Sequence, residues 1–268
     1  MEETRGILNV KAGEKKFCLK RYMPAEDLSF FVERYWAVSW DLRGQEPFVQ
    51  EVLPFPCVHL VFEEERSRIY GVETRRFTRL LEGEGRVFGI KFRPGGFYPF
   101  VKMPITRFTS TSVEFREVFG SQTWEVEENI LKCGDEVEMK AVVEIFLHER
   151  LPEQDENVEE VNRMVNYIVE HREVTRVEDL VGAIGLNKRR VQRLFHQYVG
   201  VSPKWVIGRY RLHEAAERLA EGHSMDWTKL ALDLGYFDQA HFIKDFKAMV
   251  GQTPGEYARA VQGHDAID

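Results

Sequence analysis

The chain has 268 residues, enough for two domains, and its formal net charge at pH 7 is −7. It contains no run of about 18 apolar residues, so the sequence predicts no membrane-spanning helix and no membrane partner. Cys18, Cys57 and Cys133 lie far apart without a C-x-x-C pair, and the first residues lack a secretory pattern, which predicts a cytoplasmic protein.

Residues 28–119 consist mainly of short strand-forming runs separated by glycine and proline. We expect a short helix at 28–33 and strands at 35–40, 58–62, 86–92 and 97–101. Gly83, Gly85 and Gly89 are interpreted as a hairpin turn, and the Arg93-Pro-Gly-Gly stretch as a second turn. Short strands of this kind predict a β-rich sandwich or barrel-like domain.

Aromatic side chains are dense in this half of the chain. Most of them must form the core, but some are expected to line an apolar pocket with a few polar groups, the usual form of a small-ligand site. The sequence alone does not separate these two roles. The candidates for effector binding are Trp36, Trp40, His59, Phe92 and Arg93.

Catalytic chemistry has little support from the residue types in this half. His59 is the only histidine before His148, so the clustered ligands of a metal site are missing. Cys57 and His59 alternate along one strand and can share a face, which fits a Cys–His nucleophile or a small core thiol beside a structural histidine. We favour the second interpretation and predict no enzyme activity, catalytic residue, metal or cofactor.

Helical patterns follow the strands. Residues 114–120 and 125–151 have apolar residues at helical spacing, and 151–157 is a polar break that we interpret as the linker. The expected fold class is α+β in several domains. A β-rich domain occupies 1–120, a helical connector and candidate dimerisation region occupies 121–157, and an all-α domain occupies 158–262.

The C-terminal part contains one pattern twice. Residues 180–185 correspond to 230–235 at an offset of 50, and residues 187–203 correspond to 238–254 at an offset of 51. Each copy predicts a helix, a glycine turn, a second helix, a glycine stop and a new helix that begins at Ser202-Pro203 or Thr253-Pro254. Paired helix-turn-helix units of this kind are typical of DNA-binding proteins.

The second helix of each copy has an apolar side and an exposed polar side. The predicted buried stripes are Val191, Leu194, Phe195 and Tyr198, and then Phe242, Phe246 and Met249. On the polar side, Arg and Gln can form hydrogen bonds to base edges, and Lys and Arg can contact phosphates. Ile243 is expected to contact a thymine methyl, whereas His241 is expected at the edge of the core. The residues predicted to face DNA are Lys188, Arg189, Gln192, Arg193, His196, Gln239, Ala240, Ile243, Lys244 and Lys247.

A long, ordered set of motifs runs through residues 162–261. It includes Leu194-Phe195, Gly200-Val-Ser-Pro203, Tyr210-Arg-Leu212, Gly235-Tyr-Phe-Asp-Gln-Ala-His-Phe242 and Gly251-Gln-Thr-Pro254. These motifs resemble the AraC/XylS family of bacterial transcription regulators. The resemblance implies seven helices, a long helix at 203–220 between the two units, and one recognition helix in each of two successive major grooves.

Two departures from the family pattern concern base reading. Lys244 stands where the family usually has arginine, and Ala240 corresponds to Arg189 of the first copy, so Arg189, Gln192 and Arg193 are expected to carry most of the sequence reading. Segments 32–36, 53–60 and 88–97 resemble N-terminal domains of such regulators and, distantly, cupin-like sensor domains. This second resemblance implies effector sensing, dimerisation or both.

The acidic charge lies away from the repeated units. Residues 160–262 hold 15 basic and 13 acidic residues, whereas residues 1–159 hold 22 basic and 29 acidic residues. Local charge rather than the total decides phosphate contact, so the negative sum does not exclude DNA binding. It does predict modest affinity that falls strongly with salt.

The sequence therefore predicts a nucleoid-associated, effector-controlled transcription regulator. The expected partners are double-stranded promoter DNA, a small-molecule effector, RNA polymerase and a second copy of the chain. Two alternatives stay open: a dimeric DNA-binding protein that senses nothing, and a small-molecule enzyme fused to a DNA-binding domain.

Overall fold

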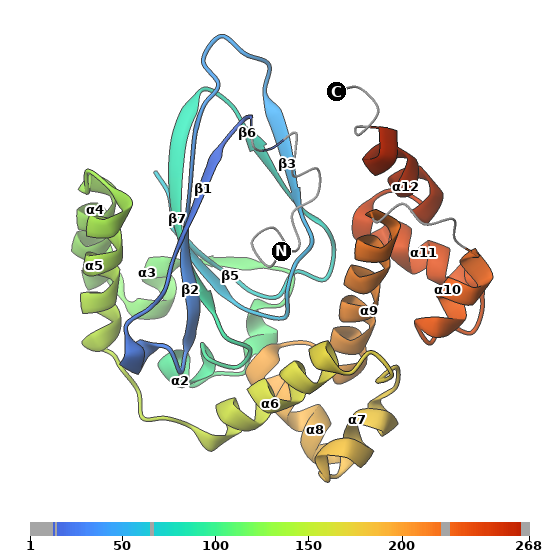
Figure 1. Ribbon diagram of the computed structural model, residues 1–268. Helices are drawn as coiled ribbons and strands as arrows, with labels where there is room; N and C mark the ends of the chain where they lie inside the picture. The colour runs from blue at the N-terminus through green and yellow to red at the C-terminus, as the bar shows by residue number, and fades with distance from the viewer. Residues whose placement is uncertain (1–12, 14, 65–66, 221–225, 264–268) are drawn as a thin grey trace.

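The computed structural model describes residue 13 and residues 15–64, 67–220 and 226–263. A strand-rich N-terminal part is followed by a helical C-terminal part, which confirms the α+β prediction (Figure 1). No helix among these residues is long and apolar enough to cross a membrane.

The N-terminal part is built on a six-stranded sheet and a separate two-stranded ribbon. All strand pairs are antiparallel. In spatial order the sheet contains β1 (Cys18–Tyr22), β2 (Val32–Asp41), β7 (Glu84–Phe92), β4 (His59–Phe62), β5 (Arg68–Tyr70) and β8 (Ser112–Glu114). The ribbon pairs β3 (Phe48–Val52) with β6 (Phe77–Leu81), and it lies across one face of the sheet (Figure 1).

Two glycines of β7 make room for two tryptophans of β2. In the register of this pair Trp36 is opposite Gly89 and Trp40 is opposite Gly85. A Cβ atom at Gly89 would lie 2.1 Å from the Trp36 ring, and one at Gly85 would lie 2.4 Å from the Trp40 ring. The expectation that all three glycines form a turn is therefore wrong, because only Gly83, with φ +59°, lies between strands.

Two short elements also differ from the expectation. Residues 97–101 contain helix α2 (Tyr98–Val101) instead of a strand. Proline in its first turn removes a ladder donor and has a φ suited to a helix start, so Pro99 disfavours the strand. The expected helix at 28–33 is a single 3₁₀ turn, η1 (Glu26–Leu28), and β2 already begins at Val32.

A set of helices covers the opposite face of the sheet. These are α3 (Phe115–Phe119), η3 (Ser121–Thr123), α4 (Trp124–Lys132) and α5 (Glu136–His148), preceded by η2 (Ile105–Phe108). The single helical stretch expected at 125–151 is interrupted because Asp135 caps α5, accepting hydrogen bonds from the backbone amides of Val137 and Glu138 at 2.9 Å. Ile130, Val143 and Phe146 are buried in the same core as the sheet residues.

The C-terminal part consists of helices in two hydrophobic clusters. Its elements are α6 (Glu156–Glu170), α7 (Val177–Ile184), α8 (Lys188–Leu194), the π-helical turn η4 (Phe195–Val199), α9 (Pro203–Ala220), α10 (Trp227–Asp233), α11 (Gln239–Val250) and α12 (Pro254–Gly263). One cluster surrounds the first half of α9 and the other surrounds its second half. The long helix predicted at 203–220 is confirmed, and it connects the two groups of helices (Figure 1).

Hydrogen bonds join the two parts of the chain. The Thr109 hydroxyl donates to the carbonyl of Gly200 at 2.6 Å, and the Gln197 amide donates to the Tyr98 hydroxyl at 2.6 Å. The Asn162 side chain donates to the carbonyl of Pro94 at 3.0 Å. The β-rich part therefore packs directly against the helices around η4.

Replacing Gly89 by alanine tests the packing of Trp36. The new methyl group overlaps the indole ring, so we expect Gly89→Ala to lower the free energy of unfolding by about 1–3 kcal/mol. Gly182→Ala is the control, because nothing lies within 4 Å of that position in α7, and it should stabilise by about 0.5–1 kcal/mol. Urea unfolding measures both, and equal effects would contradict the assigned packing.

Candidate nucleic-acid interface and ligand cavity

The first helix-turn-helix unit combines α7, a turn at Gly185 and α8. Gly185 has φ +75°, a left-handed conformation that favours glycine. Asn187 caps α8 by accepting a hydrogen bond from the amide of Arg190 at 2.8 Å. The four residues of the predicted apolar stripe are buried, which fixes the opposite side of the helix toward solvent.

All five residues predicted to face DNA in this unit are exposed: Lys188, Arg189, Gln192, Arg193 and His196. Lys188 forms an ion pair with Glu178 at 2.5 Å. Arg189, Gln192 and Arg193 bind no other residue of the described chain, so their donors remain available to a partner. Arg190 differs, because it is half-buried and pairs with Glu160 at 2.7 Å.

The second unit combines α10, a turn at Gly235 and α11. Asp238 caps α11 by accepting from the amide of His241 at 2.7 Å, and Gly251 ends the helix with φ +86°. The next helix begins with the predicted capping box, in which the Glu256 carboxylate accepts from the amide of Thr253 at 2.7 Å. Among the predicted residues Ala240, Lys244 and Lys247 are exposed, and Gln239 is half-buried.

One expectation for α11 is corrected. Ile243 is half-buried against the second hydrophobic cluster instead of lying fully outward. Val250, two turns further along, is buried too, so the apolar stripe is wider than predicted. His241 is exposed, its Nε2 lies 3.4 Å from the carboxylate of Asp245, and its ring lies 5.3 Å from that of Tyr236, which packs at the edge of the same cluster. Helix α11 exposes two lysines where α8 exposes one lysine and two arginines, so it presents less positive charge.

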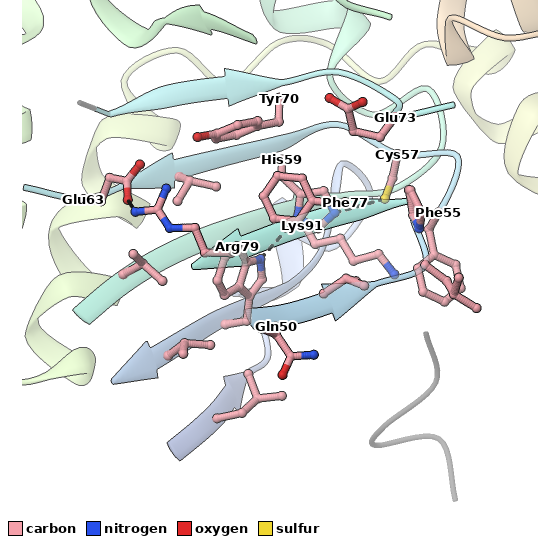
Figure 2. A pocket seen from close by; sticks show the side chains of 18 of the residues that line it. Gln50, Phe55, Cys57, His59, Glu63, Tyr70, Glu73, Phe77, Arg79 and Lys91 are labelled. Atoms are coloured by element: carbon pink, nitrogen blue, oxygen red, sulfur yellow. Dashed lines mark hydrogen bonds and ion pairs between the residues drawn. The ribbon is translucent and has the colours of Figure 1, made fainter. Parts of the chain in front are cut away.

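A cavity of about 260 Å³ lies between the sheet and the β3–β6 ribbon (Figure 2). Three of the predicted effector residues, Trp36, Trp40 and His59, line it. Phe92 is instead fully buried in the sheet core. The Nε of Arg93 donates to the carbonyl of Ser29 at 2.6 Å and so joins the end of β7 to the segment before β2. Neither of them lines the cavity.

The sequence prediction did not include several residues that line the cavity. Phe77 belongs to the ribbon strand β6 and Tyr70 to the sheet strand β5, and Phe55 and Glu73 line the cavity as well (Figure 2). Residues 34, 36, 38 and 40 all line it, and this alternation along β2 is a signal that identifies one strand face. No comparable signal shows that β6 folds over that face, because the contact joins strands far apart in sequence.

Cys57 and His59 lie within contact distance, with 3.4 Å between Sγ and Nε2. The indole N–H of Trp36 donates to Nδ1 of His59 at 3.2 Å, which assigns the histidine proton to Nε2. Burial lowers the pKa of His59 to about 3 and raises the pKa of Cys57 to about 12. Both groups are neutral at pH 7, and this geometry favours a core thiol beside a structural histidine.

Most charged side chains around the cavity are paired. Arg79 and Glu63 form an ion pair at 2.5 Å at one end of the cavity. Lys91 pairs with Glu33 at 2.9 Å and lies over the Phe55 ring, 4.3 Å from its centroid. Glu73 is the exception, because it forms no hydrogen bond or ion pair with the described part of the chain. Burial raises its pKa.

One wall of the cavity also contacts helix α9. The Phe55 ring centroid lies 4.8 Å from that of His213 and 6.5 Å from that of Tyr210. Leu53, another lining residue, belongs to the second hydrophobic cluster together with Leu212 of α9. The segment 53–55 therefore separates the cavity from the helix that joins the two helix-turn-helix units.

Arg209 of α9 is a buried charge that also contacts the β-rich part. It is 4% exposed, donates from Nη2 to the carbonyl of Thr74 at 3.1 Å, and lies over the Trp205 ring at 4.7 Å. Nη1 has no acceptor among the described residues. Burial lowers its pKa to about 10. A guanidinium without a carboxylate is costly to bury, so this contact is less stable than its packing alone would make it.

Two known families match separate parts of the chain. Residues 180–260 match a family described as Helix-turn-helix domain, and residues 20–114 match a Domain of unknown function (DUF6597). A helix-turn-helix-type transcriptional regulator of Haemophilus influenzae is 31% identical over 85 residues, which cover 32% of this chain and 28% of that protein. The raffinose operon transcriptional regulatory protein RafR of Pediococcus pentosaceus is 26% identical over 106 residues, covering 39% and 38%.

Among solved structures, an AraC-type transcriptional regulator from Chromobacterium violaceum is 25% identical, with a TM-score of 0.32, over 35% of this chain and 85% of that chain. A TM-score this low carries no conclusion about the whole chain. This chain spans only about a third of the length of the curated relatives named above. Residues 180–260 form a helix-turn-helix domain, and this confirms the helix-turn-helix units predicted from the repeated motifs.

The neutral state of Cys57 makes its thiol unreactive in the folded protein. In a Cys18→Ser/Cys133→Ser variant, iodoacetamide at pH 8 should alkylate Cys57 only after unfolding, because the thiolate is the nucleophile. The matched control retains exposed Cys18 alone, which should react in the native state. Mass spectrometry follows both, and native labelling of Cys57 as fast as Cys18 would restore the nucleophile interpretation.

Proposed function

We propose that the protein is a transcription regulator that binds promoter DNA with two helix-turn-helix units. The observation that carries the proposal is the exposed face of α8, where Arg189, Gln192 and Arg193 extend from a capped helix without side-chain partners among the residues that the structure describes. Arginine and glutamine are the side chains that form paired hydrogen bonds to guanine and adenine in the major groove. The match of residues 180–260 to a helix-turn-helix family supports this role for the face.

The two units have different tasks in this proposal. The first unit reads most of the base sequence. The second unit, with Lys244 and Lys247 exposed beside Ala240, mainly contacts phosphates. The half-buried Ile243 is withdrawn from the set of base-contacting residues.

We further propose that the cavity binds a small-molecule effector. Its wall at 53–55 is shared with α9, so a ligand that displaces Phe55 changes the packing of the helix that connects the two units. Such a ligand shifts the protein only if its affinity differs between the two arrangements. The domain boundaries at 120 and 157 stay a prediction.

Substitutions on the two recognition helices test DNA binding. With a site selected from random DNA, Arg193→Ala should cost about 1–3 kcal/mol and relax the preference at one base pair. Lys247→Ala should weaken all sequences equally and reduce the salt dependence by about one phosphate contact. Fluorescence anisotropy over a salt series measures both.

Lys132→Ala is the control, because this exposed lysine lies on α4 and pairs only with Glu128 at 2.6 Å. It should leave affinity and salt dependence unchanged. If Arg193→Ala preserves both affinity and base preference, the assignment of α8 as the reading helix is wrong.

The exposed side of α5 supports a homodimer. Val137 and Ile145 are 62% and 60% exposed, and exposed Ala141 lies between them at helical spacing. We propose that a second copy covers this stripe through a two-fold contact, which brings the same surface of both copies together. DNA-binding proteins gain a second half-site by this arrangement.

A lysine within that stripe should separate the copies. We expect Ile145→Lys to convert the dimer into a monomer, as measured by light scattering coupled to gel filtration, because an unpaired charge is costly to bury. Leu232→Lys is the control, since Leu232 is 58% exposed on α10, away from the stripe. A dimer that survives Ile145→Lys, or a wild-type monomer, would contradict this interface.

A further inference from the structure

We propose that the effector is a small organic cation whose charged group meets the carboxylate of Glu73 and whose apolar body meets the aromatic wall. This inference rests on the proposed role of the cavity as an effector site. It concerns the ligand's charge, which neither the family matches nor the relatives assign.

The positive side chains of the wall are not available to an anionic ligand. Arg79 is paired with Glu63, while Lys91 and Arg34 are both paired with Glu33, at 2.9 and 3.1 Å. Arg21 also interacts with another part of the chain. Arg34 and Lys91 share the one carboxylate of Glu33, so an anion would have to compete with that carboxylate, and Lys91 is only 6% exposed, so its rearrangement would disturb a packed site.

Glu73 has the opposite situation. It is half-buried, lines the cavity, and has no hydrogen-bond donor or cation from the described chain beside its carboxylate. Burial without a partner destabilises the charged form and raises the pKa. A ligand ammonium group supplies the missing partner, and a charge-assisted hydrogen bond is stronger than a neutral one.

The remaining wall suits a cation with an apolar body. Phe55, Phe77 and Tyr70 surround the cavity with aromatic rings (Figure 2). Trp36 lines it as well, and the faces of aromatic rings attract positive charge. The Phe55 ring already holds the Lys91 ammonium 4.3 Å from its centroid, so Phe77, Tyr70 and Trp36 are the rings left for the ligand's charged group, and Phe55 contacts its apolar body. Figure 2 shows Glu73 and Phe55 toward the same end of the cavity, so one ligand can reach both.

The volume limits the size of the ligand. About 260 Å³ is slightly below the range of roughly 300–1,000 Å³ that is usual for ligand pockets. A one-ring or two-ring amine is therefore a suitable probe. Tryptamine, indole-3-propionate and 3-methylindole share one ring system and differ in charge.

Calorimetry on the full chain with these three compounds tests the proposal. We expect tryptamine to bind at least about tenfold more tightly than the acid or the neutral compound, as expected for a hydrogen bond between charged groups. Glu73→Gln should remove that preference while binding 3-methylindole as the wild type does. Glu46→Gln, in an exposed loop, is the matched control and should keep the preference.

Circular dichroism shows whether Glu73→Gln folds, and Phe77→Leu provides a second variant that should weaken tryptamine several-fold by removing one ring. Preference for indole-3-propionate, or an unchanged tryptamine preference in Glu73→Gln, overturns the cation while leaving the cavity as an effector site. If none of the three compounds binds, both this proposal and the effector role of the cavity fail. DNA binding, measured separately, is unaffected by either failure.

Discussion

The arrangement of the molecule depends on helix α9 being buried along its whole length. Val206 and Ile207 near its start belong to the cluster that contains α8, while Ala215 and Leu219 near its end belong to the cluster that contains α11. Its 18 residues span about 27 Å at 1.5 Å per residue. Because one continuous helix contributes to both clusters, the two helix-turn-helix units cannot change their spacing without disrupting a hydrophobic core.

Charged residues on α9 serve two different purposes. Arg211 is 2% exposed, pairs with Glu214 at 2.6 Å and donates to the carbonyl of Ile168 at 2.6 Å. These partners compensate the buried charge and fix α9 against α6, although Nε of Arg211 has no acceptor among the described residues. Arg209 lacks such a carboxylate and faces the β-rich part, where its backbone acceptor belongs to Thr74. The charge network thus holds the helical part together more firmly than it holds the helical part to the sheet.

The features that sequence predicted well are those encoded locally. The caps at Asn187, Asp238 and Thr253, and the left-handed glycines at 185, 200, 235 and 251, require residues only a few positions apart. A duplicated pattern also indicates both helix-turn-helix units at once. The proline in α2 is a local signal too, and giving it more weight would have excluded a strand at 97–101.

The features that sequence did not predict depend on contacts between distant residues. Gly89 is recognisable as a packing position only once Trp36 is known to lie opposite it, 53 residues earlier in the chain. Phe92 and Trp36 are aromatic residues on adjacent antiparallel strands, yet one is fully buried in the core and the other lines the cavity. Which sheet face the ribbon covers decides this difference, and composition cannot show it.

The position of Phe55 makes the proposed regulation physically reasonable. Its ring is in contact with the ammonium of Lys91 and stacks near His213, so a ligand in the cavity and helix α9 compete for one side chain. Phe55 contacts Tyr210 and His213 of α9, and on the same helix the buried charge of Arg209, which has no carboxylate partner among the described residues, lowers the stability of the contact between α9 and the β-rich part. A weakly bound molecule can shift the equilibrium between two arrangements only when their free energies differ little. The shift in free energy equals the difference in the ligand's binding free energy for the two arrangements. In this proposal the burial of α9 fixes the two helix-turn-helix units relative to each other. The contact between α9 and the β-rich part is then the one that a ligand can change.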